Sequence, residues 1–200
     1  MRPKLINPPT REKLLEQAQE LMLEKGFVAT TVDEICQASG VTKGTFFHYF
    51  KSKEDLAKAA LDRFFYRQLE MVGRGAHRSA DPLERVCALV DSFIAYSKHP
   101  ATRKGCLLGN FSQELSSTHP ELRRQCEQRF AEASAIMKRE LDAARVMHLP
   151  RARLDTLGLA EHFIAVLQGS LILAKAKQDV HVIEKNLLHF KGYLRAVFGR

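Results

Sequence analysis

Hydrophobic side chains recur every three or four residues along most of the chain, which is the period of an amphipathic helix. The first such run predicts a helix over 11–25, with Thr10 as its N-cap and Gly26 as its C-terminal stop. No stretch alternates apolar and polar residues with a period of two. The predicted fold class is therefore all-α.

Two short helices follow the first one. Thr31, with Glu34 three residues later, forms a capping-box pattern that predicts the start of the second helix. Gly40 supplies a tight turn, and Thr42 is positioned to cap a third helix over 43–49. Two short helices joined by a glycine-containing turn are typical of a helix-turn-helix.

The rest of the chain is also predicted to be helical. Ser52 caps a fourth helix over 53–72, and the loop-rich segment 73–81 is the main break in the pattern. Asp81 followed by Pro82 then reads as an N-cap and a first-turn proline. Five further helices are expected, over 82–98, 102–116, 120–147, 154–177 and 182–197.

The front of the third predicted helix carries small polar residues suited to DNA. In a helix-turn-helix the second helix enters the major groove, and its first residues meet base edges. Thr42 offers a hydroxyl and nearby backbone N–H groups to a phosphate. Lys43 can reach guanine acceptors, Gly44 permits close approach, and Thr45 presents a hydroxyl and a methyl group to the bases.

The remaining residues of this helix divide into two faces. Phe46 and Phe50 are four residues apart and are expected to anchor the helix to the first and fourth helices. Phe47, His48 and Tyr49 are expected on the side of the helix that faces the DNA backbone, where His48 and Tyr49 can form hydrogen bonds with phosphates. Lys53, at the start of the fourth helix, is placed for another phosphate.

The charge of the chain supports an acidic partner only in general terms. The formal net charge is +8, with a sequence pI near 9.5. Residues 1–70 hold 11 Lys and Arg against 10 Asp and Glu, so most of the excess lies in the remainder of the chain. The case for DNA therefore rests on local placement of residues.

Other features of the sequence limit the function classes. Four cysteines, Cys36, Cys87, Cys106 and Cys126, have no CxxC spacing, so neither a metal site nor a disulfide framework is expected, and no cofactor is implied. The N-terminus lacks the apolar core of a secretory signal, and no apolar run approaches the ~20 residues of a membrane span. We expect a soluble, cytoplasmic protein with reduced thiols.

The last two predicted helices have broad apolar faces. Two-fold pairing into a four-helix interface would cover them, and the alternative is that they form internal core. Small residues such as Gly169 permit close approach between helices. The other residues expected at a dimer interface are apolar or aromatic, namely Leu167, Leu171, Leu187, Phe190, Tyr193 and Leu194.

The segment 104–115, KGCLLGNFSQEL, is a candidate for effector sensing. Two glycines, Gly105 and Gly109, interrupt its helical pattern, and a glycine in such a place often marks a packing or functional need. Positive charge beside Cys106 would favour its thiolate, whereas a buried, inert thiol is the alternative. Further candidate ligand residues are Asn110, His162 and Phe163, although His162 also suits a helix surface or an interface.

Residues 10–56 resemble the DNA-binding domain of the tetracycline-repressor (TetR) family of bacterial regulators. The similarity runs through "REKLLEQAQELMLEKGFVATTVDEICQASGVTKGTFFHYFKSKEDL". It implies a homodimeric repressor that binds a palindromic DNA operator and is released by a small-molecule effector. The implied domains are a reader over 1–52 and a ligand-binding and dimerisation domain over 53–200, with 53–72 as connecting helix.

The resemblance also implies roles for individual residues. It implies that Lys43, Gly44 and Thr45 contact DNA bases. It also implies contacts to the DNA backbone from Thr31, Thr42, Phe47, His48, Tyr49 and Lys53. Position 47 is commonly tyrosine in the family, and Phe47 lacks the hydroxyl for a phosphate. The GC segment at Cys106 is similar to a subgroup of the family that includes repressors responding to electrophiles and oxidants.

Two other function classes remain open at this point. A non-specific architectural DNA-binding protein would show affinity that follows salt but hardly changes with sequence. A helical enzyme would use Cys106 with a histidine, but no Ser/His/Asp arrangement, phosphate loop or paired-carboxylate motif supports it.

Overall fold

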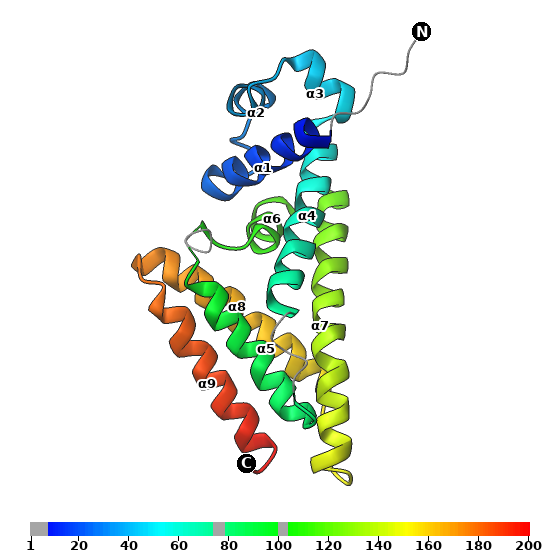
Figure 1. Cartoon of the computed structure of the whole chain (residues 1–200), viewed down its shortest axis with the longest axis vertical. Helices are drawn as coiled ribbons and strands as arrows, with labels where there is room; N and C mark the ends of the chain where they lie inside the picture. Colours follow the sequence, from blue (N-terminus) through cyan, green and yellow to red (C-terminus); the bar gives the residue numbers. More distant parts are fainter. Residues whose placement is uncertain (1–7, 74–78, 100–103) are drawn as a thin grey trace. The chain divides into compact units, whose positions relative to one another are not determined.

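The computed structural model describes residues 8–73, 79–99 and 104–200, and the described residues form helices with no strand. The predicted all-α class is confirmed. Along the chain the helices are α1 (Pro8–Lys25), α2 (Val32–Ser39), α3 (Lys43–Tyr49), α4 (Lys53–Gly73), α5 (Pro82–Ser97), α6 (Leu107–Leu115), α7 (Pro120–His148), α8 (Thr156–Lys177) and α9 (His181–Val197) (Figure 1).

The helices belong to two compact units. Unit 1 comprises residues 1–66 and 107–126, and unit 2 comprises residues 67–106 and 127–200. The long helices α4 and α7 each contribute to both units. Unit 1 thus takes in α6, which follows α3 by more than fifty residues in sequence. The predicted boundary between residues 52 and 53 stays a prediction.

Several predicted helix ends match the structure because their signals are local. Thr31 and Glu34 form a reciprocal capping box, and Gly40 adopts the left-handed conformation (φ 64°) after α2. The hydroxyl of Ser52 accepts a hydrogen bond from the backbone N–H of Asp55 (3.1 Å) at the start of α4. Asp81 caps α5 with Pro82 in the first turn.

Three predicted helix starts were wrong. Helix α1 begins at Pro8, so Thr10 lies inside the helix; proline suits a first turn because its fixed φ is helical and its missing N–H has no partner there. Helix α6 begins at Leu107, since Gly105 has φ +92°, outside the helical region; residues 102 and 103 lie outside the described residues. Helix α8 begins at Thr156, capped by Asp155.

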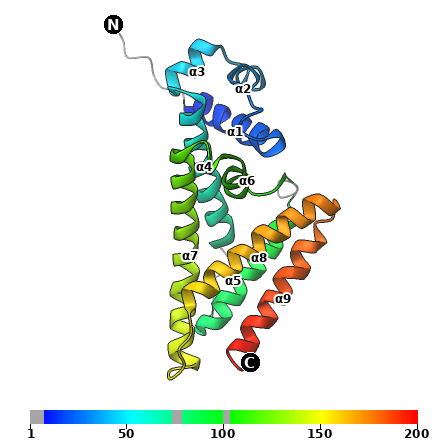
Figure 2. The same cartoon turned by 180° about the vertical axis from the view of Figure 1, so that it is seen from behind.

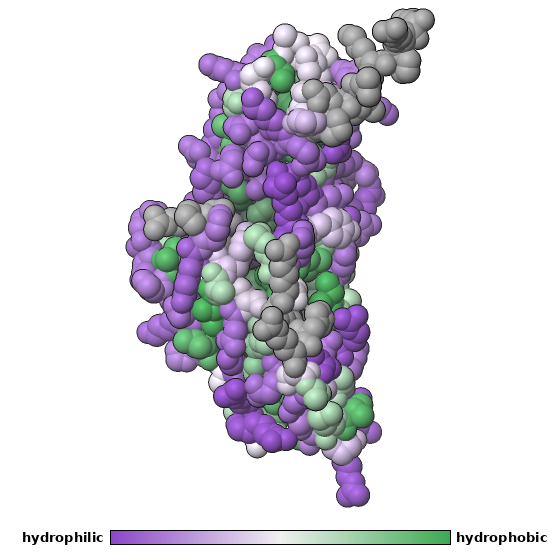
Figure 3. Space-filling view, in the orientation of Figure 1, coloured by the Kyte–Doolittle hydropathy of each residue, from purple (hydrophilic) through white to green (hydrophobic). Residues whose placement is uncertain are grey.

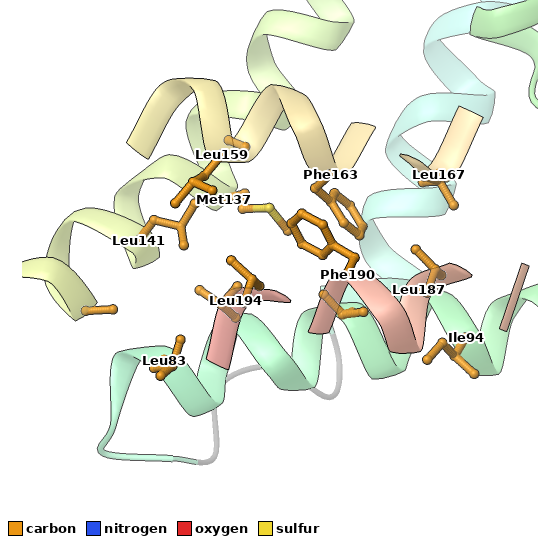
Figure 4. Packing of buried hydrophobic residues seen from close by; sticks show 14 of the residues in the cluster. Leu83, Ile94, Met137, Leu141, Leu159, Phe163, Leu167, Leu187, Phe190 and Leu194 are labelled. Carbon is orange, nitrogen blue, oxygen red and sulfur yellow. The ribbon is translucent and has the colours of Figure 1, made fainter. Parts of the chain in front are cut away.

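Unit 2 is built on a cluster of apolar side chains from α5, α7, α8 and α9. Both views show α8 and α9 side by side with α5 (Figure 1, Figure 2). Within the cluster, the rings of Phe163 from α8 and Phe190 from α9 pack together, tilted by 52° with centroids 5.4 Å apart (Figure 4). Met137 and Leu141 of α7 lie beside them. This packing fixes one face of α8 and one face of α9.

Helix α8 is unusual in its apolar content. By length and composition it would suffice to cross a membrane, a test that core helices of soluble proteins also pass. One face, including Leu159 and Phe163, is buried in the unit 2 cluster. Only 33% of its most apolar window is buried, so much of that apolar surface faces outward.

The capping box of α2 predicts a specific acid response. A hydrogen bond from Lys25, then bonds from Thr31, lower the pKa of Glu34 from 4.5 to about 2. Because the folded-state pKa is depressed, this stabilisation is present above pH 4.5 and is lost as the pH falls towards 2. We expect Glu34→Gln to melt below wild type at neutral pH, with the difference shrinking between pH 4.5 and 2. Thermal melts followed by circular dichroism measure this, and a constant difference would contradict it.

Candidate nucleic-acid interface

The exposed N-terminal end of α3 is organised by two threonines. Thr42 is the N-cap, and its hydroxyl oxygen accepts a hydrogen bond from the backbone N–H of Thr45 at 3.1 Å. The two hydroxyl oxygens are 3.0 Å apart, so each threonine fixes the rotamer of the other. Gly44 between them is exposed and has no side chain to cover the helix end. The end of α3 therefore presents small, oriented polar groups to the surroundings.

The opposite face of α3 is the anchor. Phe46 is fully buried and Phe50 is 3% exposed, which confirms that these two rings face the core. The guanidinium of Arg11 in α1 lies over the Phe50 ring, 5.4 Å from its centroid. Phe47, one residue after Phe46, is 55% exposed. Burial of two rings on one side thus turns the other side of the helix outward.

Lys43 at the start of α3 is held by an acidic neighbour in α2. Its Nζ lies 2.7 Å from a carboxylate oxygen of Asp33, and both side chains are mostly exposed. The hydrogen bond to Asp33 raises the pKa of Lys43. Exposed pairs of this kind contribute little to stability, so Lys43 can exchange Asp33 for a base or phosphate at little cost.

Of the other predicted contact residues, His48 and Thr31 are exposed and Tyr49 is half-buried. His48 is exposed and its ring meets the Tyr49 ring edge-on, with centroids 5.0 Å apart. Thr31 is exposed at the N-terminus of α2, where its hydroxyl takes part in the capping box. Helix N-termini favour phosphate through their free N–H groups and their dipole.

Lys53 is placed differently from the rest. Its Nζ donates hydrogen bonds to the backbone carbonyl oxygens of Phe27 (2.9 Å) and Thr30 (2.8 Å). It also lies over the Phe27 ring, 4.2 Å from the centroid. Burial lowers the pKa of Lys53. The ammonium group is thus bound within unit 1, and a phosphate contact from it stays a prediction.

Family models match both parts of the chain. The model "Bacterial regulatory proteins, tetR family" matches residues 14–60, which contain the helix-turn-helix. The model "Tetracyclin repressor-like, C-terminal domain" matches residues 82–190, more than half of the chain. The chain belongs to the tetR family. It is a DNA-binding transcriptional regulator, as the predicted resemblance implied.

Known relatives span nearly the whole chain. It is 31% identical over 181 residues to an uncharacterised HTH-type transcriptional regulator in the lacX 3′ region of Lactococcus lactis subsp. lactis, covering 88% of this chain and 89% of the relative. It is 27% identical over 191 residues to the HTH-type transcriptional repressor NemR of Escherichia coli K12, covering 92% and 94%. A TetR regulator structure from Chloroflexus aurantiacus J-10-FL superposes with a TM-score of 0.84 at 27% identity, covering 93% and 94%.

The predicted effector-sensing residues differ in burial and are divided between the two units. Cys106 is 5% exposed and belongs to unit 2, while Asn110 is half-buried in α6 of unit 1. Phe163 is buried in the unit 2 core, and His162 beside it is exposed, with its ring against those of Phe190 and Tyr193. Of the charges expected beside Cys106, Lys104 is half-buried and residue 103 lies outside the described part of the chain.

A cavity that sequence reasoning missed lies within unit 2, between α4, α5 and α7. It has a volume of about 260 Å³ and mostly apolar walls. Its charged lining residues are Arg85, Arg139 and Glu140, and Arg85 and Glu140 form an ion pair of 2.7 Å. Phe93 lines it, and Phe163 packs behind Phe93 at 5.2 Å between centroids. Its walls come from segments far apart in sequence, so no local motif signals it.

The predicted dimer residues divide into two groups. Leu167, Leu187, Phe190 and Leu194 are 8% exposed or less and pack within their own chain, as the internal-core alternative expected. Gly169, Tyr193 and also Phe190 line an open groove between α8 and α9, and Leu171 is half-buried. Figure 3 shows apolar residues on the surface along α9. Exposed apolar side chains on these helices are Leu157, Ile172, Leu173, Leu188 and Tyr193.

The two faces of α3 give a paired prediction. Phe46→Ala should lower the free energy of unfolding by about 3–5 kcal/mol, because it empties a fully buried site. Phe47→Ala should change it by less than about 0.5 kcal/mol, because that ring is exposed. Urea unfolding followed by circular dichroism measures both. Equal losses in the two variants would show that α3 is oriented differently.

Proposed function

We propose that this protein is a homodimeric repressor whose two α3 helices enter adjacent major grooves of a palindromic operator. The observation that carries the proposal is the two-faced α3, with Phe46 and Phe50 buried and Thr42 to Thr45 at an outward-facing end. In this reading Lys43, Gly44 and Thr45 contact bases. Contacts to the DNA backbone come from Thr31, Thr42, Phe47, His48 and Tyr49.

The groove between α8 and α9 supports the dimer. Its walls are mostly apolar, with Val166, Gly169 and Leu173 from α8 facing Phe190 and Tyr193 from α9. Leu173 and Tyr193 are 45% and 46% exposed in the single chain. An apolar face of this kind is stabilised when a second copy covers it, and a two-fold axis makes one surface complementary to itself.

Two-fold symmetry also explains why the protein would read a palindrome. Two recognition helices related by a dyad reach half-sites about one helical turn apart, roughly 34–36 Å. A single α3 reaches only a few base pairs, so loss of the dimer weakens operator binding even when each unit 1 is intact. Dimerisation and operator recognition are therefore coupled.

The dimer is tested by a charge placed in the groove. Leu173→Arg should convert the dimer to a monomer in sedimentation velocity, because a buried guanidinium would lack a partner there. The matched control is Val146→Arg, which adds the same charge at a position on α7 that is 61% exposed and outside the groove. A Leu173→Arg protein that sediments like the control would refute this interface.

For release from the operator we propose a small-molecule effector that acts in unit 2. Two sites are candidates, the Cys106 thiol and the cavity beside Arg85 and Glu140. The thiol is supported by the position of Cys106 directly before α6 and by the resemblance of its GC segment to the electrophile-responsive subgroup. An effector shifts the equilibrium only as far as its affinities for the DNA-binding and released states differ, which for a useful response is a few kcal/mol.

Alkylation distinguishes between the two candidate effector sites. Cys36 in α2 is also buried, and burial raises the pKa of its thiol. The Cys36→Ser variant therefore serves to distinguish alkylation at Cys36 from alkylation at Cys106. If Cys106 is the sensor, N-ethylmaleimide should release wild type and Cys36→Ser from operator DNA and leave Cys106→Ser bound in mobility-shift assays. Release of Cys106→Ser to the same extent would exclude the Cys106 thiol as the sensor and favour a reversible ligand in the cavity.

A further inference from the structure

The loop between α1 and α2 is hydrogen-bonded to an acidic side chain from a helix that is distant in sequence. Glu114 of α6 accepts hydrogen bonds from two consecutive backbone N–H groups, those of Phe27 at 2.9 Å and Val28 at 2.8 Å. Each carboxylate oxygen takes one of them. Glu114 is 86 and 87 residues away in sequence, and all these residues belong to unit 1. Bonds to a charged acceptor are among the stronger ones in proteins.

The other side of the same loop is held by a basic side chain. The Lys53 ammonium donates to the carbonyl oxygens of Phe27 and Thr30 and lies over the Phe27 ring. Glu114 thus accepts a hydrogen bond from the backbone N–H of Phe27, while Lys53 donates one to the backbone C=O of the same residue. The attraction of Glu114 also opposes the effect of burial on the pKa of Lys53. We call Glu114, Lys53 and the loop 26–30 between them the loop clamp.

The loop clamp depends on the absence of a side chain at Gly26. Its φ of +88° is disfavoured for residues with a side chain. A Cβ there would lie 2.8 and 2.9 Å from the two carboxylate oxygens of Glu114, closer than such atoms approach in proteins. The hydroxyl of Thr30 in turn donates to the Gly26 carbonyl oxygen at 2.6 Å. The backbone conformation and the distant carboxylate are therefore matched to each other.

We propose that Glu114 and Lys53 are positioning residues for DNA binding, which act by fixing the loop 26–30 and so the N-terminal end of α2. This inference rests on the proposed function. It gives Lys53 a task within the protein in place of the phosphate contact expected from the sequence. Neither side chain needs to touch DNA for its loss to weaken binding.

The loop clamp reaches the DNA-reading residues through short connections. Thr30, bound by Lys53, directly precedes Thr31, the N-cap of α2. Helix α2 has only eight residues, and the Gly40 turn joins it to α3. A shift at the start of α2 therefore moves both the Thr31 phosphate site and the packing of α3. Misplacement by about 1 Å is enough to weaken a preorganised site.

The test is a double-mutant cycle on operator affinity. The full-length protein carries Glu114→Gln, Lys53→Met or both, and the operator is the duplex selected by wild type from random sequences. Each single variant should bind about tenfold more weakly, because a charge-assisted contact to the loop is lost. The double variant should be no weaker than the worse single one, since both substitutions release the same loop.

Two further readouts separate positioning from direct contact. A phosphate-binding lysine lowers the slope of log affinity against log salt by about 0.9 when it is removed. We expect Lys53→Met to leave the slope unchanged. In Glu114→Gln the amide protons of Phe27 and Val28 should exchange faster with solvent, as measured by NMR, at a temperature where circular dichroism shows the protein folded.

The matched control is Glu121→Gln. It removes one carboxylate from unit 1 that pairs only with side chains of Lys58 and Arg124 in the described structure, so it changes the net charge equally. Its affinity should stay within about twofold of wild type. Glu114→Gln binding as tightly as this control, or losses that multiply to about a hundredfold in the double variant, would overturn the proposal. Failure of wild type to select any operator would instead refute the proposed function.

Discussion

The burial of Phe46 and Phe50 is the constraint on which the DNA-reading surface depends. Both rings lie on one side of a seven-residue helix and are removed from solvent, so the rotation of α3 about its axis is determined by the core of unit 1. The residues on the other side, from Thr42 to Thr45 and at Phe47 and His48, are outward as a consequence. A short helix with few internal hydrogen bonds relies on such anchoring, because helix propensity alone does not sustain it.

The sequence predicted this part of the structure well because its signals are local. The capping box at Thr31, the Gly40 turn and the four-residue spacing of Phe46 and Phe50 are all read within a few positions. Two of the helix starts that were wrong, at Thr10 and before Leu107, show the limit of the same reasoning. A threonine is a good cap only where the chain begins its helix, and two prolines moved that point upstream of Thr10.

Features that depend on long-range packing were not predictable from one sequence. The Glu114 carboxylate meets Phe27 and Val28 across more than eighty residues, and no pattern at position 114 distinguishes it from an ordinary surface glutamate. The apolar faces of α8 and α9 were recognised, but which stripe faces inward depends on where α5 and α7 pack. Leu187 and Leu194 consequently lie in the core, and Leu173 and Tyr193 lie at the surface.

The most direct measurement of the central claim is selection of duplex DNA from a random-sequence pool by the full-length protein. The account predicts enrichment of an inverted repeat whose half-site centres are about 10–10.5 base pairs, or a small multiple of that, apart, since each α3 of a dimer reads one half-site. Enrichment of isolated, unpaired sites, or no enrichment over the starting pool, would contradict the claim that two α3 helices engage one duplex.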